Sequence, residues 1–198
     1  MDFKNETRVN KVVTTGRVIS IRNVSKSKCI VTVISRNGRD IYPRFLCDIS
    51  KIPPLQTHAR VQVEGYIESH RYKDNEDGKW KVEQRIVADS IEPAVTITEE
   101  YFGKTGKFFA PFNTTVFIKG VVTDVKKSDN WYKYNINVSE DEQLPLTIQV
   151  SMKELERHPN IKKHDTVCTV CGISTPQKVF GDTTYNYENI VVSDIAIV

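Results

Sequence analysis

The chain has 198 residues, of which 39% are hydrophobic and 27% charged, so one large or two small folded domains are possible and a disordered chain is excluded. No run of eighteen apolar residues occurs, and the polar N-terminus lacks the apolar core of a signal peptide. We therefore expect no membrane span and a cytoplasmic location.

Positive charge is concentrated in the first half of the chain. Residues 1–97 hold 17 Lys and Arg against 12 Asp and Glu, whereas residues 98–198 hold 11 against 13. Nine of the ten arginines lie in the first half. Arginine stacks on bases and forms bidentate hydrogen bonds to phosphates better than lysine does. If the chain binds an anionic strand, the first half should dominate.

The first half reads as five strands joined by tight turns. The turn signals are Asn37-Gly38 and Asp77-Gly78, and Pro53-Pro54 argues against a long helix in the connector after the third strand. The predicted strands span residues 11–22, 28–35, 40–47, 60–69 and 80–91. Strand, hairpin, connector, hairpin is the order that a small Greek-key barrel of the oligonucleotide/oligosaccharide-binding (OB) type requires.

Residues 98–111 form the predicted linker between the two halves. They include four aromatic rings, which are too many for a solvated tether. We therefore expect the linker to pack along a barrel. Its glycines and lysines do not have the spacing of a phosphate-binding loop.

The second half follows the same plan. Predicted strands span residues 114–126, 132–138, 146–150, 166–174 and 183–193. The capping-box pattern Ser151-Met152-Lys153-Glu154 predicts the start of a short helix, which Pro159 would end. The predicted fold class is all-β with a short helix, as two tandem five-stranded Greek-key OB barrels.

Three pairs of segments repeat between the halves. Gly16 matches Gly120, Gly65 matches Gly172, and the segment 86–91 matches 190–195, at offsets of 104, 107 and 104 residues. These matches favour two copies of one domain, with domains at 1–97 and 112–198 and a linker at 98–111. Chance alignment of valine-rich strands is the alternative.

The four cysteines include one Cys-x-x-Cys, Cys168 to Cys171. A zinc site would need a second pair or suitably spaced histidines, and the chain supplies neither. Residues three apart on a strand point to opposite faces, so we interpret these residues as ordinary strand cysteines. No metal and no cofactor is expected.

Two stretches carry a family resemblance. The first, Asn10–Val18, alternates apolar and polar residues around Gly16. The second, Val61–Asp74, alternates around Gly65 and runs into a hairpin rich in cations and rings. Together they resemble the bacterial single-stranded DNA-binding proteins of the OB fold, over residues 10–91. The resemblance implies a barrel that captures single-stranded DNA by phosphate neutralisation and base stacking.

By this resemblance, Tyr42 and Arg44 fall on the third strand, and Tyr72 on the last hairpin, at positions that contact DNA. Trp80, across that hairpin, would give a second stacking platform. The cations expected to neutralise phosphates are Arg71, Lys73, Lys79, Lys81 and Arg85. The alternative is that the tyrosines pack against the barrel and that the cations form a solvated face.

The second half has its own candidate rings. They are Trp131, Tyr132, Tyr134, Tyr185 and Tyr187. Cations are sparse around them in the sequence, so this face either binds nucleic acid or packs against the first barrel or a second chain. Alternate residues face opposite ways, so Trp131 should not be buried if Tyr132 and Tyr134 are.

The preferred function is non-enzymatic, largely sequence-independent binding of single-stranded DNA in replication, recombination or repair. The resemblance also implies a homodimer and replication or recombination proteins as partners, and RNA stays open as a ligand. A tandem-OB scaffold that binds another protein is the alternative. A nuclease is disfavoured, because Asp74, Glu76 and Asp77 read as a solvated turn rather than as metal ligands.

Overall fold

The structure is a computed structural model, and it divides the chain into two compact units. Unit 2 contains residues 12–66 and 86–114, and unit 1 contains residues 1–11, 67–85 and 115–198. The structure describes residues 6–73, 78, 80–94, 96–98, 107–109, 112–141, 145–154, 159–180, 183–186 and 188–198.

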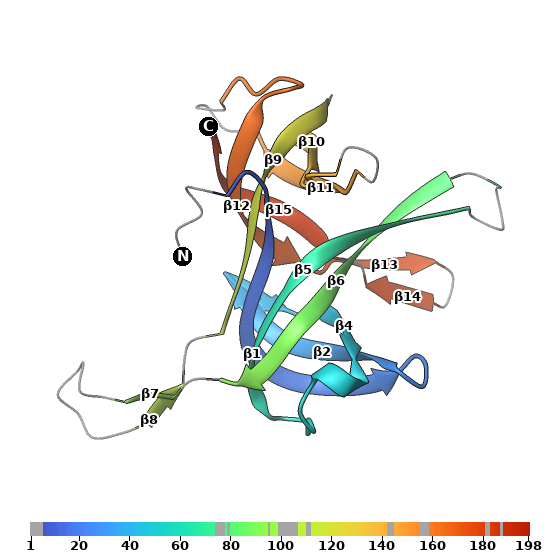
Figure 1. Cartoon of the computed structure of the whole chain (residues 1–198), viewed down its shortest axis with the longest axis vertical. Helices are drawn as coiled ribbons and strands as arrows, with labels where there is room; N and C mark the ends of the chain where they lie inside the picture. Colours follow the sequence, from blue (N-terminus) through green and yellow to red (C-terminus); the bar gives the residue numbers. More distant parts are fainter. Residues whose placement is uncertain are drawn as a thin grey trace. The chain divides into compact units, whose positions relative to one another are not determined.

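The first barrel lies in unit 2 and closes on itself (Figure 1). Its strands run in the order β1-β5-β6-β4-β2, and β2 returns to pair with β1. The elements are β1 (Val9–Asn23), β2 (Lys28–Asn37), β3 (Arg39–Ile41), β4 (Arg44–Asp48), the 3₁₀ helix η1 (Ile49–Lys51), β5 (Arg60–Lys73) and β6 (Trp80–Pro93). The outer parts of β5 and β6, residues 67–85, belong to unit 1.

The second barrel lies in unit 1 and has the same connectivity. Its order is β10-β11-β15-β12-β9, and β10 also pairs with β9. The elements are β9 (Asn113–Ser128), β10 (Trp131–Asn137), β11 (Thr147–Lys153), β12 (Thr166–Ser174), β13 (Gln177–Phe180), β14 (Thr183–Asn186) and β15 (Asn189–Ile197). In the stretch of chain that follows β6, β7 (Thr96–Thr98) and β8 (Lys107–Phe109) pair with each other.

In each barrel, the third strand of the predicted five pairs in parallel with the fifth. Phe45 on β4 lies opposite Ile86 on β6, and Ser151 on β11 lies opposite Val191 on β15. Antiparallel pairing joins β1 to β2 and β5, β2 to β4, β9 to β10 and β12, β10 to β11, and β12 to β15, as a five-stranded Greek-key barrel requires. The predicted fold class, an all-β chain of OB-type barrels, is confirmed.

The prediction that a short helix starts at Ser151–Glu154 is wrong. Residues 151–153 belong to β11 and pair with Lys133, Tyr132 and Trp131 of β10. Val150, Ser151 and Met152 are all buried, so packing of this strand in the sheet outweighs the local capping signal. Residues 155–158 lie outside the part that the structure describes. The short helix that is described is η1, in the first barrel.

The predicted third strand of the first barrel is broken into β3 and β4 at Tyr42 and Pro43. Proline has no backbone N–H to give to a ladder, so it stands at a break. The Pro43 carbonyl still accepts a hydrogen bond from Val33 N at 3.1 Å. This break leaves Tyr42 exposed between two buried residues, Ile41 and Pro43.

The first strands of the two barrels bend in the same way. A Cβ on Gly16 would meet the Ile34 carbonyl oxygen, and a Cβ on Gly120 would meet that of Asn137. Each strand also has a register shift, around Ile19 in β1 and around Thr123 in β9. All these equivalences have the predicted 104-residue offset. The predicted match of Gly65 with Gly172 is one residue off, because the register equivalent of Gly65 is Cys171.

The connector before the fourth strand also repeats. His58 and His164 have φ of 70° and 78°, in the left-handed region. His58 N donates to the Val18 carbonyl at 2.7 Å, and His164 N donates to the Val122 carbonyl at 2.8 Å. The same backbone turn therefore precedes β5 and β12.

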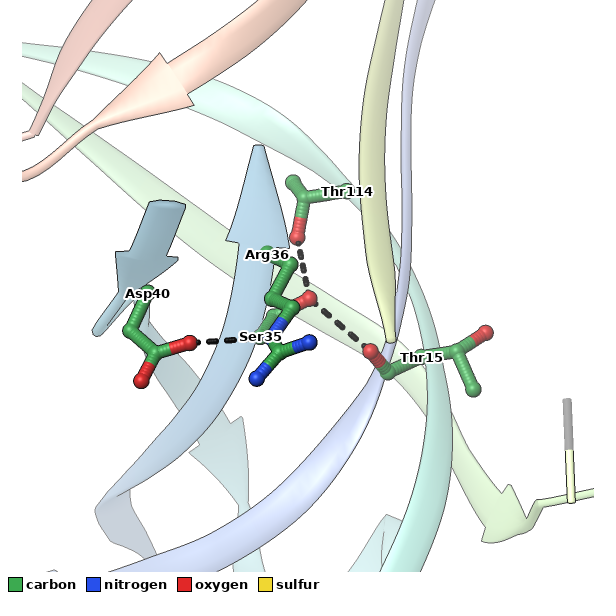
Figure 2. Close-up of polar contacts among 5 residues, drawn as sticks. All are labelled: Thr15, Ser35, Arg36, Asp40 and Thr114. Atoms are coloured by element: carbon green, nitrogen blue, oxygen red, sulfur yellow. Dashed lines mark hydrogen bonds and ion pairs between the residues drawn. The ribbon is translucent and has the colours of Figure 1, made fainter. Parts of the chain in front are cut away.

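A buried group of hydroxyls lies inside the first barrel (Figure 2). Thr114 Oγ1 is 3.1 Å from Thr14 Oγ1 and 3.0 Å from Ser35 Oγ, and Ser35 Oγ donates to the Thr15 carbonyl at 2.8 Å. These bonds satisfy polar groups that burial would otherwise leave unpaired. Beside them, Arg36 and Asp40 form an exposed ion pair at 3.0 Å.

The remaining linker residues, 99–106 and 110–111, lie outside the described part, and so does the predicted packing of the linker rings. Within the described residues, no helix is long and apolar enough to cross a membrane.

Candidate nucleic-acid interface

The outer face of β1, β2 and β4 in the first barrel has an apolar centre and a cationic border. Residues 29, 31 and 33 of β2 are buried, so residues 28, 30, 32 and 34 face outward. Cross-strand pairing places Leu46 beside Ile30 on this outer face. The half-buried apolar residues are Ile30, Ile34 and Leu46, and the bordering cations are Arg17, Arg22, Lys28 and Arg44. We call this set the β2–β4 face.

Arg17 and Arg22 were not predicted from the sequence, because strict alternation would place them on opposite faces of β1. The register shift between Val18 and Ser20 changes this. Arg17 lies opposite Ile34 and Arg22 lies opposite Ile30, and these two isoleucines share one face of β2. The bulge therefore brings both guanidinium groups to the same side.

Of the predicted residues, Arg44 lies on this face and Tyr42 precedes it by two residues, in the break between β3 and β4. Tyr42 is 43% exposed and Arg44 is half-buried on β4, directly opposite Thr32. An exposed ring offers a flat face on which a base can stack.

The β5–β6 hairpin carries most of the other predicted residues. Lys73 is exposed at the end of β5. Arg85 is paired with Glu83, with 3.2 Å between Nη2 and Oε2, so its charge is partly compensated. The other predicted side chains of this hairpin lie outside the described part; they are Arg71, Tyr72, Lys79, Trp80 and Lys81. The loop carboxylates at 74, 76 and 77 also lie outside it.

The second barrel has a cationic face around Trp131, which is 39% exposed. Lys153 lies opposite Trp131 on β11, and Lys133 lies opposite Lys126 on β9. Lys126 is itself 3.6 Å from Asp124. We call these residues the Trp131 face. Lys153 was missed by the sequence analysis because only strand pairing brings it beside the ring.

Tyr134 is fully buried in the core of the second barrel, so its prediction as a base-stacking residue is wrong. Burial raises the pKa of its hydroxyl to about 12, and the neighbouring Tyr132 adds to the effect. The two tyrosine rings stack with centroids 6.1 Å apart. Trp131 is exposed while Tyr134, on the opposite face of β10, is buried, as the spacing predicts.

Tyr132 is half-buried and belongs to a surface cluster. Lys127 Nζ lies 2.6 Å from Glu154 Oε1 and 5.3 Å from the centre of the Tyr132 ring. The Tyr132 hydroxyl donates to the same Glu154 oxygen at 3.3 Å. The hydrogen bond to Glu154 raises the pKa of Lys127. Tyr132 is therefore held by its neighbours on the opposite face of β10 from Trp131.

Tyr185 is on β14, where its backbone lies opposite Lys178 on β13. Its side chain lies outside the described part, and so does Tyr187. The prediction that these two rings bind nucleic acid stays a prediction.

The cysteines are free and arranged as strand residues. Cys168 lies opposite Lys119 and Cys171 lies opposite Val116, which places the two sulfurs on opposite faces of β12. Cys29 and Cys47 lie directly opposite each other on β2 and β4, and burial raises the pKa of Cys47 to about 12. Among the described residues, no group of three or more His, Cys, Asp or Glu side chains is placed to hold a metal ion.

Comparison with solved structures shows the fold in another protein. The chain is similar to the wild-type single-stranded DNA-binding protein from Thermus aquaticus, with a TM-score of 0.60, 13% sequence identity, and coverage of 96% of this chain and 93% of that one. A deletion mutant of the same protein matches with a TM-score of 0.60, 14% identity, and coverage of 97% and 95%. No protein-family model and no curated protein matches the chain.

Proposed function

We propose that the chain binds single-stranded DNA with little dependence on sequence and without chemistry. The observation that carries this proposal is the β2–β4 face, where cations border an apolar centre and the exposed Tyr42 lies two residues from Arg44. Outer faces of the second and third strands are where OB barrels bind oligonucleotides. The fold shared with the Thermus aquaticus protein supports the proposal.

The proposed mechanism divides the work between charge and stacking. Arg17, Arg22 and Arg44 neutralise phosphates, and counterion release drives binding. Tyr42 stacks on an unpaired base, which needs only the flat face that every base has. The half-buried isoleucines supply apolar contact without reading base edges. Binding of this kind tolerates any sequence, and RNA is an alternative ligand.

The wider role is proposed on the same grounds. We place the activity in DNA replication, recombination or repair, in the cytoplasm, with proteins of those processes as partners and a homodimer as the assembly. The shared connectivity and the 104-residue offsets support an origin by duplication of one domain, with a linker at 98–111. The Trp131 face gives the second barrel a ring and cations of its own for the same ligand.

The experiment is a fluorescence titration of labelled oligothymidine at several salt concentrations. The unaltered chain should bind at low salt and weaken steeply as salt rises. Each phosphate contact contributes about −0.7 to the slope of log affinity against log salt for a single strand. The double variant Arg17→Ala/Arg22→Ala should bind more weakly and flatten that slope by about one unit or more.

Arg36→Ala is the matched control, because that arginine is exposed but already paired with Asp40 at 3.0 Å. It should leave affinity and slope nearly unchanged. A chain that does not bind at low salt, or binds with no salt dependence, would rule out the proposal.

The alternative is a protein-binding scaffold, and exposed apolar residues favour it. Ile21, Val24 and Ile49 are exposed at the end of β1, in the β1–β2 turn and in η1. The Ile49 N–H donates to the Ser27 carbonyl at 2.9 Å, which joins the turn to η1. A tight protein partner that is lost in Val24→Asp, in a chain without oligonucleotide binding, would favour the scaffold.

A further inference from the structure

The outer part of the β5–β6 hairpin, residues 67–85, is bonded to β11 of the second barrel within unit 1. The Gln84 amide makes two of these bonds to one residue: its Nε2 donates to the Gln149 carbonyl at 3.2 Å, and its Oε1 accepts from Gln149 N. From the other hairpin strand, Ser69 Oγ donates to the Thr147 carbonyl at 2.5 Å. Both strands of the hairpin are thus held against residues 147–149.

The geometry of the Gln84 contact resembles a strand pairing. A side-chain amide presents one donor and one acceptor, as a backbone peptide does. Gln149 pairs with Asn135 of β10 on one side, so Gln84 occupies its other edge. The amide therefore caps a strand edge and sets where the hairpin lies along β11.

The bonded segment of β11 leads directly to the Trp131 face. The Gln149 side chain donates to Asn135 Oδ1 at 3.1 Å, and Asn135, Lys133 and Trp131 alternate along one face of β10. The bonded residues of the hairpin therefore lie against the same strand that carries Lys153 of the Trp131 face. On the hairpin itself, Lys73 is exposed at the end of β5.

We propose that Gln84 and Ser69 are positioning residues that hold the hairpin against β11, so that one single-stranded nucleic acid contacts both Lys73 and the Trp131 face. This inference rests on the proposed function. Two weak sites joined rigidly bind a long ligand much more tightly than a short one, because the second contact is made at high effective concentration. Freeing the hairpin lowers that effective concentration without removing either contact surface.

The experiment compares Gln84→Ala with the unaltered chain on two oligothymidines, one of about 8 and one of about 30 nucleotides. Loss of the clamp should weaken binding of the long strand about tenfold or more and leave the short strand nearly unchanged. Hydrogen exchange of the Gln149 amide, whose acceptor is Gln84, should accelerate in the same variant and reports the clamp directly.

Gln62→Ala is the matched control, because the Gln62 amide bonds to Glu64 at 3.3 Å. It should change neither readout. Gln84→Glu should also weaken binding of the long strand, because a carboxylate cannot donate to the Gln149 carbonyl. It should accelerate exchange of the Gln149 amide less than Gln84→Ala does, because the carboxylate still accepts from Gln149 N. Ser69→Ala should shift the length dependence in the same direction by a smaller factor.

The outcomes separate the two proposals. If the unaltered chain binds oligothymidine and Gln84→Ala keeps the same ratio of long-strand to short-strand affinity while the Gln149 amide exchanges faster, the positioning role is wrong and the proposed function stands. If the unaltered chain binds neither oligonucleotide, the proposed function fails and this inference fails with it.

Discussion

A Cβ atom on Gly16 would lie 2.3 Å from the carbonyl oxygen of Ile34, on the neighbouring strand β2. Real Cβ atoms do not approach a backbone oxygen so closely, so only glycine allows β1 to bend here. The second barrel repeats the relationship, with 2.2 Å between a Cβ on Gly120 and the Asn137 carbonyl oxygen. Each barrel therefore closes around a glycine that packs against the backbone of its second strand.

Gly16→Ala and Gly120→Ala should each lower the free energy of unfolding by at least about 2 kcal/mol, because backbone must move to admit the methyl group. Chemical denaturation followed by circular dichroism measures the loss. Gly38→Asn is the control: a Cβ there meets nothing within 4 Å, and asparagine tolerates its φ of 72°. A Gly16→Ala chain as stable as the control would contradict the prediction.

Ser35→Ala should lower the free energy of unfolding by about 1–3 kcal/mol. It removes the donor to the buried Thr15 carbonyl and a partner of the Thr114 hydroxyl at the same time. Ser20→Ala, on the exposed part of β1, should change stability by less than about 0.5 kcal/mol. Equal losses in the two variants would show that the hydroxyl group contributes nothing specific.

Tyr42→Ala should weaken oligothymidine binding by about 1–3 kcal/mol if the ring stacks on a base. Tyr42→Phe should retain most of the affinity, because stacking uses the ring and not the hydroxyl. Fluorescence anisotropy at fixed salt measures both variants. Thermal unfolding serves as the control, since an exposed side chain of this kind contributes little to folding. Equal affinities for Ala and Phe would remove Tyr42 from the proposed site.

Much of the fold follows from short-range signals in the sequence. Two-residue periodicity and the turn at Asn37-Gly38 locate the strands, and Gly38 adopts the positive φ that this turn needs. The error at Ser151–Lys153 arises because a capping box is a local preference, whereas burial of Val150 and Met152 depends on the whole barrel. Tertiary packing overrides the local pattern there.

The candidate site was harder to predict, because its members meet through pairings that no local pattern contains. A one-residue bulge decides that Arg17 and Arg22 share a face. Lys153 reaches Trp131 only through the β10–β11 register. Alternation shows that Trp131 and Tyr134 face opposite ways, but which of the two faces the core depends on the closed barrel.

The buried hydroxyl of Tyr134 predicts how the second barrel responds to alkaline pH. Burial raises its pKa from 10.0 to about 12, so the folded state keeps a proton that the unfolded state loses. Below pH 10 the hydroxyl is protonated in both the folded and the unfolded state, so its contribution to the free energy of unfolding does not change with pH. It falls as the pH rises from about 10 to about 12, because the unfolded state then binds fewer protons than the folded state.

Tyr134→Phe removes the titrating group and keeps the ring in the core. The difference in unfolding free energy between the unaltered chain and this variant should be constant below pH 10. Above pH 10 the unaltered chain should lose stability relative to the variant, by up to about 1.4 kcal/mol for each pH unit up to about pH 12. Cys47 and Cys171 also have pKa values raised to about 12, but both are present in the two chains and cancel in the comparison. A difference that stays flat through pH 11 would mean that the Tyr134 hydroxyl ionises in the folded barrel as readily as in water.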